Sequence, residues 1–483
     1  MLFNSFEFLI FLPTVFLLYW FVFKRLRLQN IFIVIVSYIF YGWWDWRFLF
    51  LIAMTTAFSY YSGLLLERAE ESRKKQKMIS AANITLNLVI LAVFKYFNFF
   101  SENFARLFQT FGLQLDWVTL DILLPVGISF YTFQALSYTI DVYQKKLSPT
   151  HDVIAFFAYI SFFPQLVAGP IERSTNLLPQ FYKKRKFDYG QAVDGMRQIL
   201  WGLFKKIVVA DNCAVIVNSI FSNYGDYNGS TLLLGAILFT FQIYGDFSGY
   251  SDIAIGTARL FGFNLMRNFN VPYFSRDIAE FWRRWHISLT TWFRDYIYIP
   301  LGGSRNGKWK SFRNTVIIFL ISGFWHGANW TFVLWGAYHA FLFLPLLLLD
   351  KNRKFRNTVA EGRFLPNFKE FIQMCSTFLL VVVGWIIFRA ENIGQAWGYI
   401  KRVFSSSLFQ LPDLSLPNIN RTIVFILVLT LIEWMHRNKQ YGFQFQDRGV
   451  MSRRVVRWGV YYLLIAFTLY FAGKQASFIY FQF

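Results

Sequence analysis

The sequence predicts an all-α integral membrane protein, and three observations support this prediction. Of the 483 residues, 55% are hydrophobic and only 16% are charged, whereas soluble chains typically have about 25% charged residues. Aromatic residues make up 21% of the chain, as is typical of bilayer proteins with interfacial aromatic belts. Long apolar segments recur from end to end, separated by basic runs. A soluble enzyme, a disordered chain and a collagen-like chain are therefore excluded.

The charge balance points to a membrane rather than to nucleic acid. The formal net charge is +21, and in a membrane protein such an excess marks cytoplasmic loops and contacts with anionic lipid. We therefore expect membrane lipid and no nucleic acid as a partner. Cys213 and Cys375 are the only cysteines, so no disulfide framework and no cysteine metal site is expected. No other spacing of residues indicates a metal.

The membrane topology follows from the basic runs. The first apolar segment, residues 6–23, has no basic leader or cleavage site, so we expect a retained span. Lys24, Arg25 and Arg27 follow it and place its end in the cytoplasm. The same rule predicts about twelve crossings, with both termini on the exoplasmic face. The predicted spans are 6–23, 30–42, 47–66, 81–99, 123–143, 195–221, 231–250, 314–326, 329–349, 371–388, 422–435 and 458–473.

Two stretches do not fit simple spans. Residues 152–182 contain Pro164, Gly169 and Pro170 and predict a re-entrant segment. Residues 251–310 are apolar in places but carry seven arginines, so their backbone must be buried in protein or line a cavity. We expect one integral-membrane domain over residues 1–483, with 251–330 as its catalytic region.

His326 is the first candidate for chemistry, because ionisable residues within apolar segments are costly and usually functional. It lies in Phe324–Trp330, the break between two spans that form a hairpin. A helix from Lys310 to His326 would place the imidazole about 24 Å from the cytoplasmic surface. A shielded, neutral imidazole could act there as a general base. A capping or packing histidine at a tight turn explains the residue equally well.

His286 is the second candidate. It lies in a segment with an aromatic stripe at helical spacing, which predicts an amphipathic helix on the cytoplasmic side. The arginines of this helix could bind lipid phosphates. Alternatively, they could hold an anionic donor such as a pyrophosphate, with His286 pointing into the same cavity. The stripe consists of Phe281, Trp285, Leu289 and Trp292.

The other histidines have ordinary explanations. His151 and His436 lie in polar loops and are expected to be solvated. His339 lies within a predicted span and is expected to pack between helices through a hydrogen bond.

Two polar clusters accompany the histidines. Tyr244–Asp252 places Asp246 and Asp252 at a glycine-rich break at the end of a span, and Glu172 lies in the predicted re-entrant turn. Asn329 follows His326 in the hairpin. Such groups either satisfy unwound backbone or line a tunnel.

Three sequence strings carry a resemblance to a known family. They are Arg276–Thr290, Tyr298–Gly303 and Phe324–Trp330, and together they resemble the membrane-bound O-acyltransferase family, in particular its alginate O-acetyltransferase branch. The resemblance implies a ring of about 11–12 transmembrane helices, with re-entrant and amphipathic helices around a central tunnel. It also implies that an acyl group moves from a cytoplasmic thioester to a hydroxyl on the other side. The family's near-invariant histidine corresponds to His326, and its second catalytic position to His286.

The resemblance also implies substrates and partners. The donor would be acetyl-CoA or an acylated carrier protein, and Arg283, Arg284 and Lys308 are candidates for holding its phosphates. Residues 474–483 resemble an exoplasmic C-terminal aromatic motif in which a tyrosine relays the acyl group. Tyr480 would be that relay, and an aromatic belt anchor is the alternative.

The expected setting is the bacterial inner membrane. A separate exoplasmic or periplasmic acetyltransferase of the SGNH type would then acetylate a polysaccharide, which meets this chain only indirectly. The competing interpretation is a multi-pass transporter or flippase in which intramembrane His and Asp residues form a proton relay. Inverted repeats would favour a transporter, and none is visible in the sequence.

Overall fold

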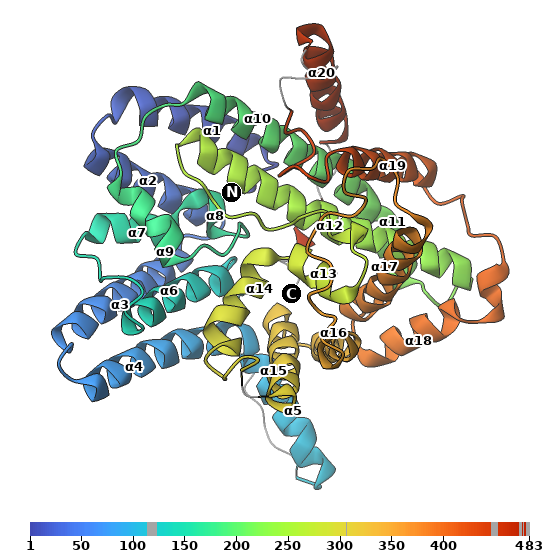
Figure 1. Cartoon of the computed structure of the whole chain (residues 1–483), viewed down its shortest axis with the longest axis horizontal. Helices are drawn as coiled ribbons and strands as arrows, with labels where there is room; N and C mark the ends of the chain where they lie inside the picture. Colours follow the sequence, from blue (N-terminus) through green and yellow to red (C-terminus); the bar gives the residue numbers. More distant parts are fainter. Residues whose placement is uncertain (114–122, 306, 446–452, 473–475, 477, 480–483) are drawn as a thin grey trace. The chain divides into compact units, whose positions relative to one another are not determined.

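The computed structural model describes residues 1–113, 123–305, 307–445, 453–472, 476 and 478–479, and all regular secondary structure in these ranges is helical (Figure 1). The chain forms two compact units. The first unit comprises Met1–Ala192 and Ala258–Leu265, and the second comprises Val193–Thr257 and Met266–Phe483.

The first unit contains the N-terminal helices. Helix α1 begins after Ser5, whose hydroxyl accepts a hydrogen bond from the Phe8 N–H at 3.3 Å, and such a cap satisfies one orphan donor of the first turn. The helices of this unit are α1 (Phe6–Leu17), η1 (Leu18–Val22), α2 (Leu26–Gly42), α3 (Phe48–Arg68), α4 (Arg73–Leu91), η2 (Ala92–Tyr96), α5 (Phe97–Thr110), α6 (Ile128–Tyr143), α7 (Val153–Ser161), α8 (Phe163–Leu166), α9 (Ser174–Leu177) and η3 (Leu178–Tyr182).

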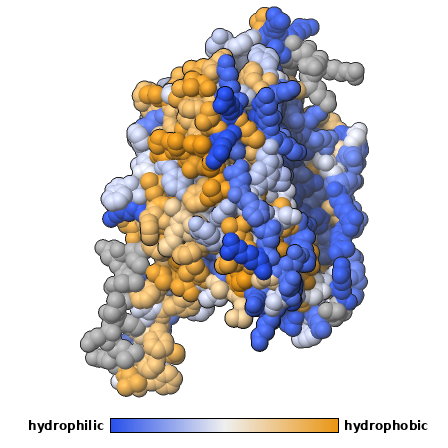
Figure 2. Space-filling view, turned by 90° about the vertical axis from the view of Figure 1, so that its left-hand side faces the viewer, coloured by the Kyte–Doolittle hydropathy of each residue, from blue (hydrophilic) through white to orange (hydrophobic). Residues whose placement is uncertain are grey.

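Large apolar side chains cover much of the outer surface of these helices. On α3, Phe50, Tyr61 and Leu65 are all exposed, and Figure 2 shows broad hydrophobic areas on the face it presents, beside strongly hydrophilic ones. A soluble protein rarely exposes apolar patches of this extent. Lipid contact accounts for them.

Residues 152–182 are broken into short helices, as predicted for a segment that is not a simple span. Helix α7 ends at Ser161, and α8 starts anew with Pro164 in its first turn. The Phe163 N–H donates to the Ser37 hydroxyl at 3.1 Å, which satisfies a main-chain group that the break leaves without a helical partner.

The second unit contains the remaining helices. Helix α10 (Tyr189–Leu203) belongs to the second unit from Val193 onwards, and helix α12 (Gly229–Leu260) belongs to it as far as Thr257. The others are η4 (Phe204–Ala210), α11 (Asp211–Ser222), η5 (Pro272–Phe274), α13 (Ile278–Arg284), α14 (Ile287–Phe293), η6 (Arg294–Tyr298), α15 (Lys308–His326), α16 (Trp330–Leu348), α17 (Phe368–Arg389), α18 (Ile393–Val403), η7 (Ser406–Phe409), α19 (Ile419–Met435) and α20 (Arg454–Phe471).

The protein is a multi-pass membrane protein. Each predicted span falls on helix in the described chain, and five helical stretches are both long and apolar enough to cross a bilayer. The five are Phe48–Arg68, Arg73–Thr110, Gly229–Leu260, Trp330–Leu348 and Phe368–Arg389.

The predicted glycine-rich break at Tyr244–Asp252 is wrong. Helix α12 continues through this segment to Leu260, so the region predicted to be irregular from residue 251 begins as regular helix. The glycines serve close packing instead. A Cβ on Gly249 would lie 2.8 Å from the Gly202 carbonyl oxygen, and one on Gly245 would lie 3.0 Å from the Lys205 carbonyl oxygen.

Helices α15 and α16 form the predicted hairpin and lie side by side (Figure 1). Helix α15 ends at His326, and α16 begins after Asn329, whose side chain accepts a hydrogen bond from the Thr331 N–H at 3.0 Å. At Gly323 and Gly336, a Cβ would collide with a main-chain carbonyl of the opposite helix. Small residues at these positions allow the two backbones to approach closely.

Candidate active site

His286 lies at a break between the short helices α13 and α14. Its backbone is left-handed (φ 42°, ψ 55°), a conformation that is uncommon for a residue with a side chain and that clusters at functional sites. The aromatic stripe therefore does not form the single amphipathic helix that was predicted. Residues 268–270 hold the break open, because the Ile287 N–H donates to the Asn268 carbonyl and the Asn270 N–H to that of Arg284, both at 2.9 Å.

The Asn268 side chain fixes the orientation of the His286 ring. Its Oδ1 lies 3.1 Å from His286 Nδ1 and accepts a hydrogen bond from the Ser288 hydroxyl at 2.9 Å. Its Nδ2 donates to the Ser251 hydroxyl at 3.1 Å, which turns the amide oxygen towards the imidazole. Because an amide oxygen only accepts, Nδ1 carries the proton and the neutral ring presents Nε2 as an acceptor.

Burial keeps this imidazole neutral. His286 is 1% exposed, and desolvation lowers its pKa to about 3. Aromatic rings surround it. The centroids of the Phe247, Trp325 and Phe269 rings lie 4.7, 6.0 and 6.4 Å from that of His286.

His326 lies in the same aromatic enclosure. It is the last residue of α15 and is 4% exposed. The rings of Trp325, Trp335 and Phe388 lie 5.0, 5.1 and 5.4 Å from its own. Since Trp325 contacts both imidazoles, the structure brings the two predicted histidines together around one indole.

Two buried lysines, which the sequence analysis missed, bind the two predicted aspartates of α12. Lys205 pairs with Asp252 at 2.5 Å, and Lys206 pairs with Asp246 at 2.8 Å. Both lysines belong to η4, a seven-residue π-helix, and π-helices occur frequently at functional sites. The sequence contains a signal for these ion pairs, because two adjacent lysines inside the predicted span 195–221 are costly unless they are paired.

A small open pocket lies beside this site. Asn268 and Phe269 line it, and both also contact His286. One layer of side chains therefore separates the pocket from the imidazole. The charged residues of its lining are Lys205, Asp252, Arg267, Glu433 and Lys439.

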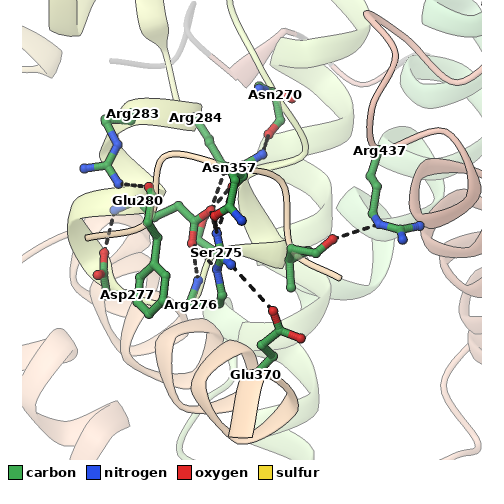
Figure 3. A network of polar contacts seen from close by, with 12 residues as sticks. Asn270, Ser275, Arg276, Asp277, Glu280, Arg283, Arg284, Asn357, Glu370 and Arg437 are labelled. Carbon is green, nitrogen blue, oxygen red and sulfur yellow. Dashed lines mark hydrogen bonds and ion pairs between the residues drawn. The ribbon is translucent and has the colours of Figure 1, made fainter. Parts of the chain in front are cut away.

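The arginines of α13 have protein partners of their own. Arg284 pairs with buried Glu280 at 2.8 Å, and Arg276 pairs with the same carboxylate at 3.0 Å (Figure 3). Arg283 donates to the main-chain oxygens of Asn352 at 2.6 Å and Phe355 at 2.5 Å. The contacts of Arg283 fasten α13 to the loop that follows α16. Arg283 and Arg284, two of the three predicted phosphate ligands, thus have structural partners in the protein.

The remaining predicted site residues lie elsewhere. Lys308 pairs with Asp350 at 2.8 Å, and both side chains are exposed. Asn329 caps α16, and its Nδ2 donates to the Glu391 carbonyl at 2.8 Å. Glu172 belongs to the first unit, where it is buried and accepts a hydrogen bond from Asn176 at 2.6 Å. Tyr480 lies outside the described residues.

The other histidines differ in their surroundings. His151 is exposed and pairs with Glu67 at 3.0 Å, in keeping with a solvated loop residue. His436 directly follows α19, is partly buried and lines the pocket. His339 is fully buried between Trp282 and Trp335, at 4.9 and 5.0 Å between ring centroids.

The chemistry available to the site comes from its two imidazoles and the charged pocket. Within the described part of the chain, no group of three or more His, Cys, Asp or Glu side chains could hold a metal ion. A buried neutral imidazole can accept a proton from a hydroxyl, and its aromatic surroundings exclude water from the proton transfer.

Comparison with known proteins gives a consistent result. Residues 78–383, which include both histidines, match the sequence model described as MBOAT, the membrane-bound O-acyltransferase family. The chain is 41% identical to the probable alginate O-acetylase AlgI of Pseudomonas aeruginosa, over 89% of this chain and 80% of that protein. It is 30% identical to the peptidoglycan O-acetyltransferase of Helicobacter pylori, over 100% and 98%. A teichoic acid D-alanyltransferase of Bacillus subtilis is 28% identical over 55% and 69%.

Proposed function

The chain belongs to the membrane-bound O-acyltransferase family, and from this premise we propose that it moves an acetyl group from a cytoplasmic thioester across the bacterial inner membrane for O-acetylation of an exoplasmic polysaccharide. The names of its relatives support an acetyl group and a polysaccharide, since alginate and peptidoglycan both occur among them. The observation that carries the mechanism is the pair of buried histidines around Trp325.

His326 is the proposed general base. It removes the proton from the attacking hydroxyl, the hydroxyl oxygen bonds to the thioester carbonyl carbon, and the carbon–sulfur bond breaks. The proton held by His326 then passes to the leaving thiolate, so that a thioester and an alcohol become an ester and a thiol. A group in this role typically contributes a factor of about 10² to 10⁴ in rate.

His286 is proposed to orient the attacking hydroxyl. Its Nδ1 proton is directed at Asn268, so Nε2 can accept a hydrogen bond from a hydroxyl. The same tautomer has no Nε2 proton with which to polarise a thioester carbonyl. The structure thus supports the orienting role of His286 over the polarising one.

The donor is proposed to be acetyl-CoA or an acetylated carrier protein, both of which carry phosphate. Among the candidate cations, Arg267 and Lys439 line the pocket next to Asn268. Arg284 is paired inside the protein, and Arg283 binds main-chain oxygens. We therefore propose Arg267 and Lys439 as phosphate ligands ahead of Arg283, Arg284 and Lys308.

Tyr480 is the proposed first acceptor. A phenyl ester remains activated, so a second transfer to an alcohol is favourable. An exoplasmic acetyltransferase of the SGNH type would carry out that second step on the polysaccharide. In the described tail, Phe478 and Ile479 are buried in the second unit, which supports a role for the end of the chain near the histidines.

The proposal is tested with purified protein in lipid nanodiscs and acetyl-labelled CoA or carrier protein, measuring thiol release and label bound to the protein. His326→Ala is expected to lower the rate by about 10² to 10⁴ without changing the elution profile of the protein. His151→Ala, which alters an exposed histidine, is the matched control. Undiminished acetyl transfer by His326→Ala would exclude the proposed base.

A further inference from the structure

Three buried charges of the second unit meet at Lys206. Its ammonium lies 2.8 Å from an oxygen of Asp211 and 2.8 Å from an oxygen of Asp246. Lys206, Asp211 and Asp246 are each at most 5% exposed. All three groups are removed from water, and buried charged and polar groups require hydrogen-bond partners.

The C-terminal tail supplies polar groups to this cluster. The Ile479 N–H donates to Asp246 Oδ2 at 2.7 Å, and Lys206 donates to the Ala476 carbonyl at 3.1 Å. The tail thus offers a donor to a carboxylate and an acceptor to the ammonium. Hydrogen bonds to charged groups are the stronger class, and both contacts use only the main chain of the tail.

Phe478 sets the register of the tail. It is 2% exposed, and its ring lies 4.9 Å from Tyr250 and 6.2 Å from Phe247 of α12. The Phe247 ring also lies 4.7 Å from that of His286. Phe247 therefore neighbours both the anchored tail and the candidate catalytic imidazole.

We propose that Lys206, Asp211 and Asp246 form a clamp that binds the main chain of the C-terminal tail and holds it beside His286. These three are positioning residues, and their importance for acetyl transfer rests on the proposed function. The π-helix η4 makes the clamp possible because it directs Lys206 at the tail while Lys205 reaches Asp252 and Ser248. Since the clamp contacts main-chain atoms, a conservative exchange of a side chain in the tail keeps both hydrogen bonds.

Photo-crosslinking of the full-length protein in nanodiscs tests the clamp. Benzoylphenylalanine replaces Phe478, and mass spectrometry measures its crosslinks to α12. Lys206→Met removes the ammonium, and Ile479→Pro removes the N–H that binds Asp246. Both changes are expected to lower the crosslink yield at least tenfold.

Two matched controls accompany these variants. Lys205→Met removes an equally buried lysine whose partners are Asp252 and Ser248 rather than the tail, and Ile479→Val keeps the main-chain N–H. Both are expected to keep the crosslink. Undiminished crosslinking in Lys206→Met and Ile479→Pro, or equal losses in the two controls, would overturn the clamp.

Acetyl transfer by the same variants separates the clamp from the proposed function. If the tail presents the acceptor, Ile479→Pro lowers kcat at least tenfold and leaves the KM for the donor unchanged. Loss of the crosslink with full acetyl transfer would uphold the clamp and refute the proposed relay through the tail. Loss of acetyl transfer with an intact crosslink would refute the clamp as the positioning device.

Discussion

Replacement of Asn268 by aspartate tests whether this residue controls the state of His286. In the wild type, burial lowers the pKa of His286 to about 3, so the ring is neutral across the physiological range. Asn268→Asp puts a carboxylate at the position of an amide oxygen 3.1 Å from Nδ1. An opposite charge at this distance typically raises a histidine pKa by about 1 to 3 units. We therefore expect a pKa of about 4 to 6 in the variant.

The substitution should leave the fold intact. Aspartate accepts the hydrogen bond of Ser288 as asparagine does, and the Ser251 hydroxyl, which now accepts from the Asn268 amide at 3.1 Å, can rotate to donate instead. Asn268→Leu is the contrasting variant, because it removes the acceptor for Nδ1. Loss of the correct tautomer is expected to slow acetyl transfer by about 10² to 10⁴.

The assay is a pH titration of ¹³C-labelled histidines by NMR in nanodiscs, with His286→Gln to assign the signal. The wild-type signal should stay constant from pH 4 to pH 8, and in Asn268→Asp it should move within that range. A wild-type His286 that titrates near pH 6.5, or an unchanged signal in Asn268→Asp, would refute the reasoning from burial and tautomer.

Three further predictions concern stability and donor binding. Glu280→Gln removes the carboxylate that two buried arginines share and should destabilise the protein by about 3 to 5 kcal/mol. Thermal unfolding in detergent measures this, and equal stability of Glu280→Gln and Asp350→Asn, which breaks only an exposed pair, would contradict it. Arg267→Gln should raise the KM for the donor about tenfold and leave kcat unchanged. An unchanged KM in steady-state kinetics would show that Arg267 does not bind the donor phosphates. Because the folded-state pKa of His286 is lowered, the contribution of its neutral ring to stability is present above about pH 6.5 and is lost as the pH falls towards about 3. The midpoint of thermal unfolding should therefore fall more steeply with acid in the wild type than in His286→Gln. Parallel pH dependences of the two proteins would contradict this.

The helical hairpin at His326 was predictable because its signal is local. Two apolar segments flank a short polar break, and the structure ends α15 at His326 and starts α16 after Asn329. The membrane class followed as directly from composition. Both features depend only on residues close together in the sequence and on whether the chain is surrounded by lipid or by water.

The surroundings of His286 could not be predicted in the same way. Periodicity indicated one continuous helix, whereas main-chain hydrogen bonds with Asn268 and Asn270 break that helix at the histidine. The Ile287 N–H donates to Asn268, 19 residues earlier in the chain, and the Asn270 N–H donates to Arg284, 14 residues later. Likewise, the glycines of α12 look like a helix break in sequence but serve contact with η4. The partners of Arg283, the main-chain oxygens of Asn352 and Phe355, are also set by tertiary packing, which no spacing rule conveys.

The wide turn of η4 constrains how this sequence can change. Within it, hydrogen bonds skip one more residue than in an α-helix, as in the bond from the Asp211 N–H to the Lys206 carbonyl. Deleting one residue would restore ordinary winding and rotate everything on one side of the deletion by about 100°. Lys205 and Lys206 could then no longer both face α12. Insertions and deletions should therefore be rarer in this turn than exchanges of its apolar side chains.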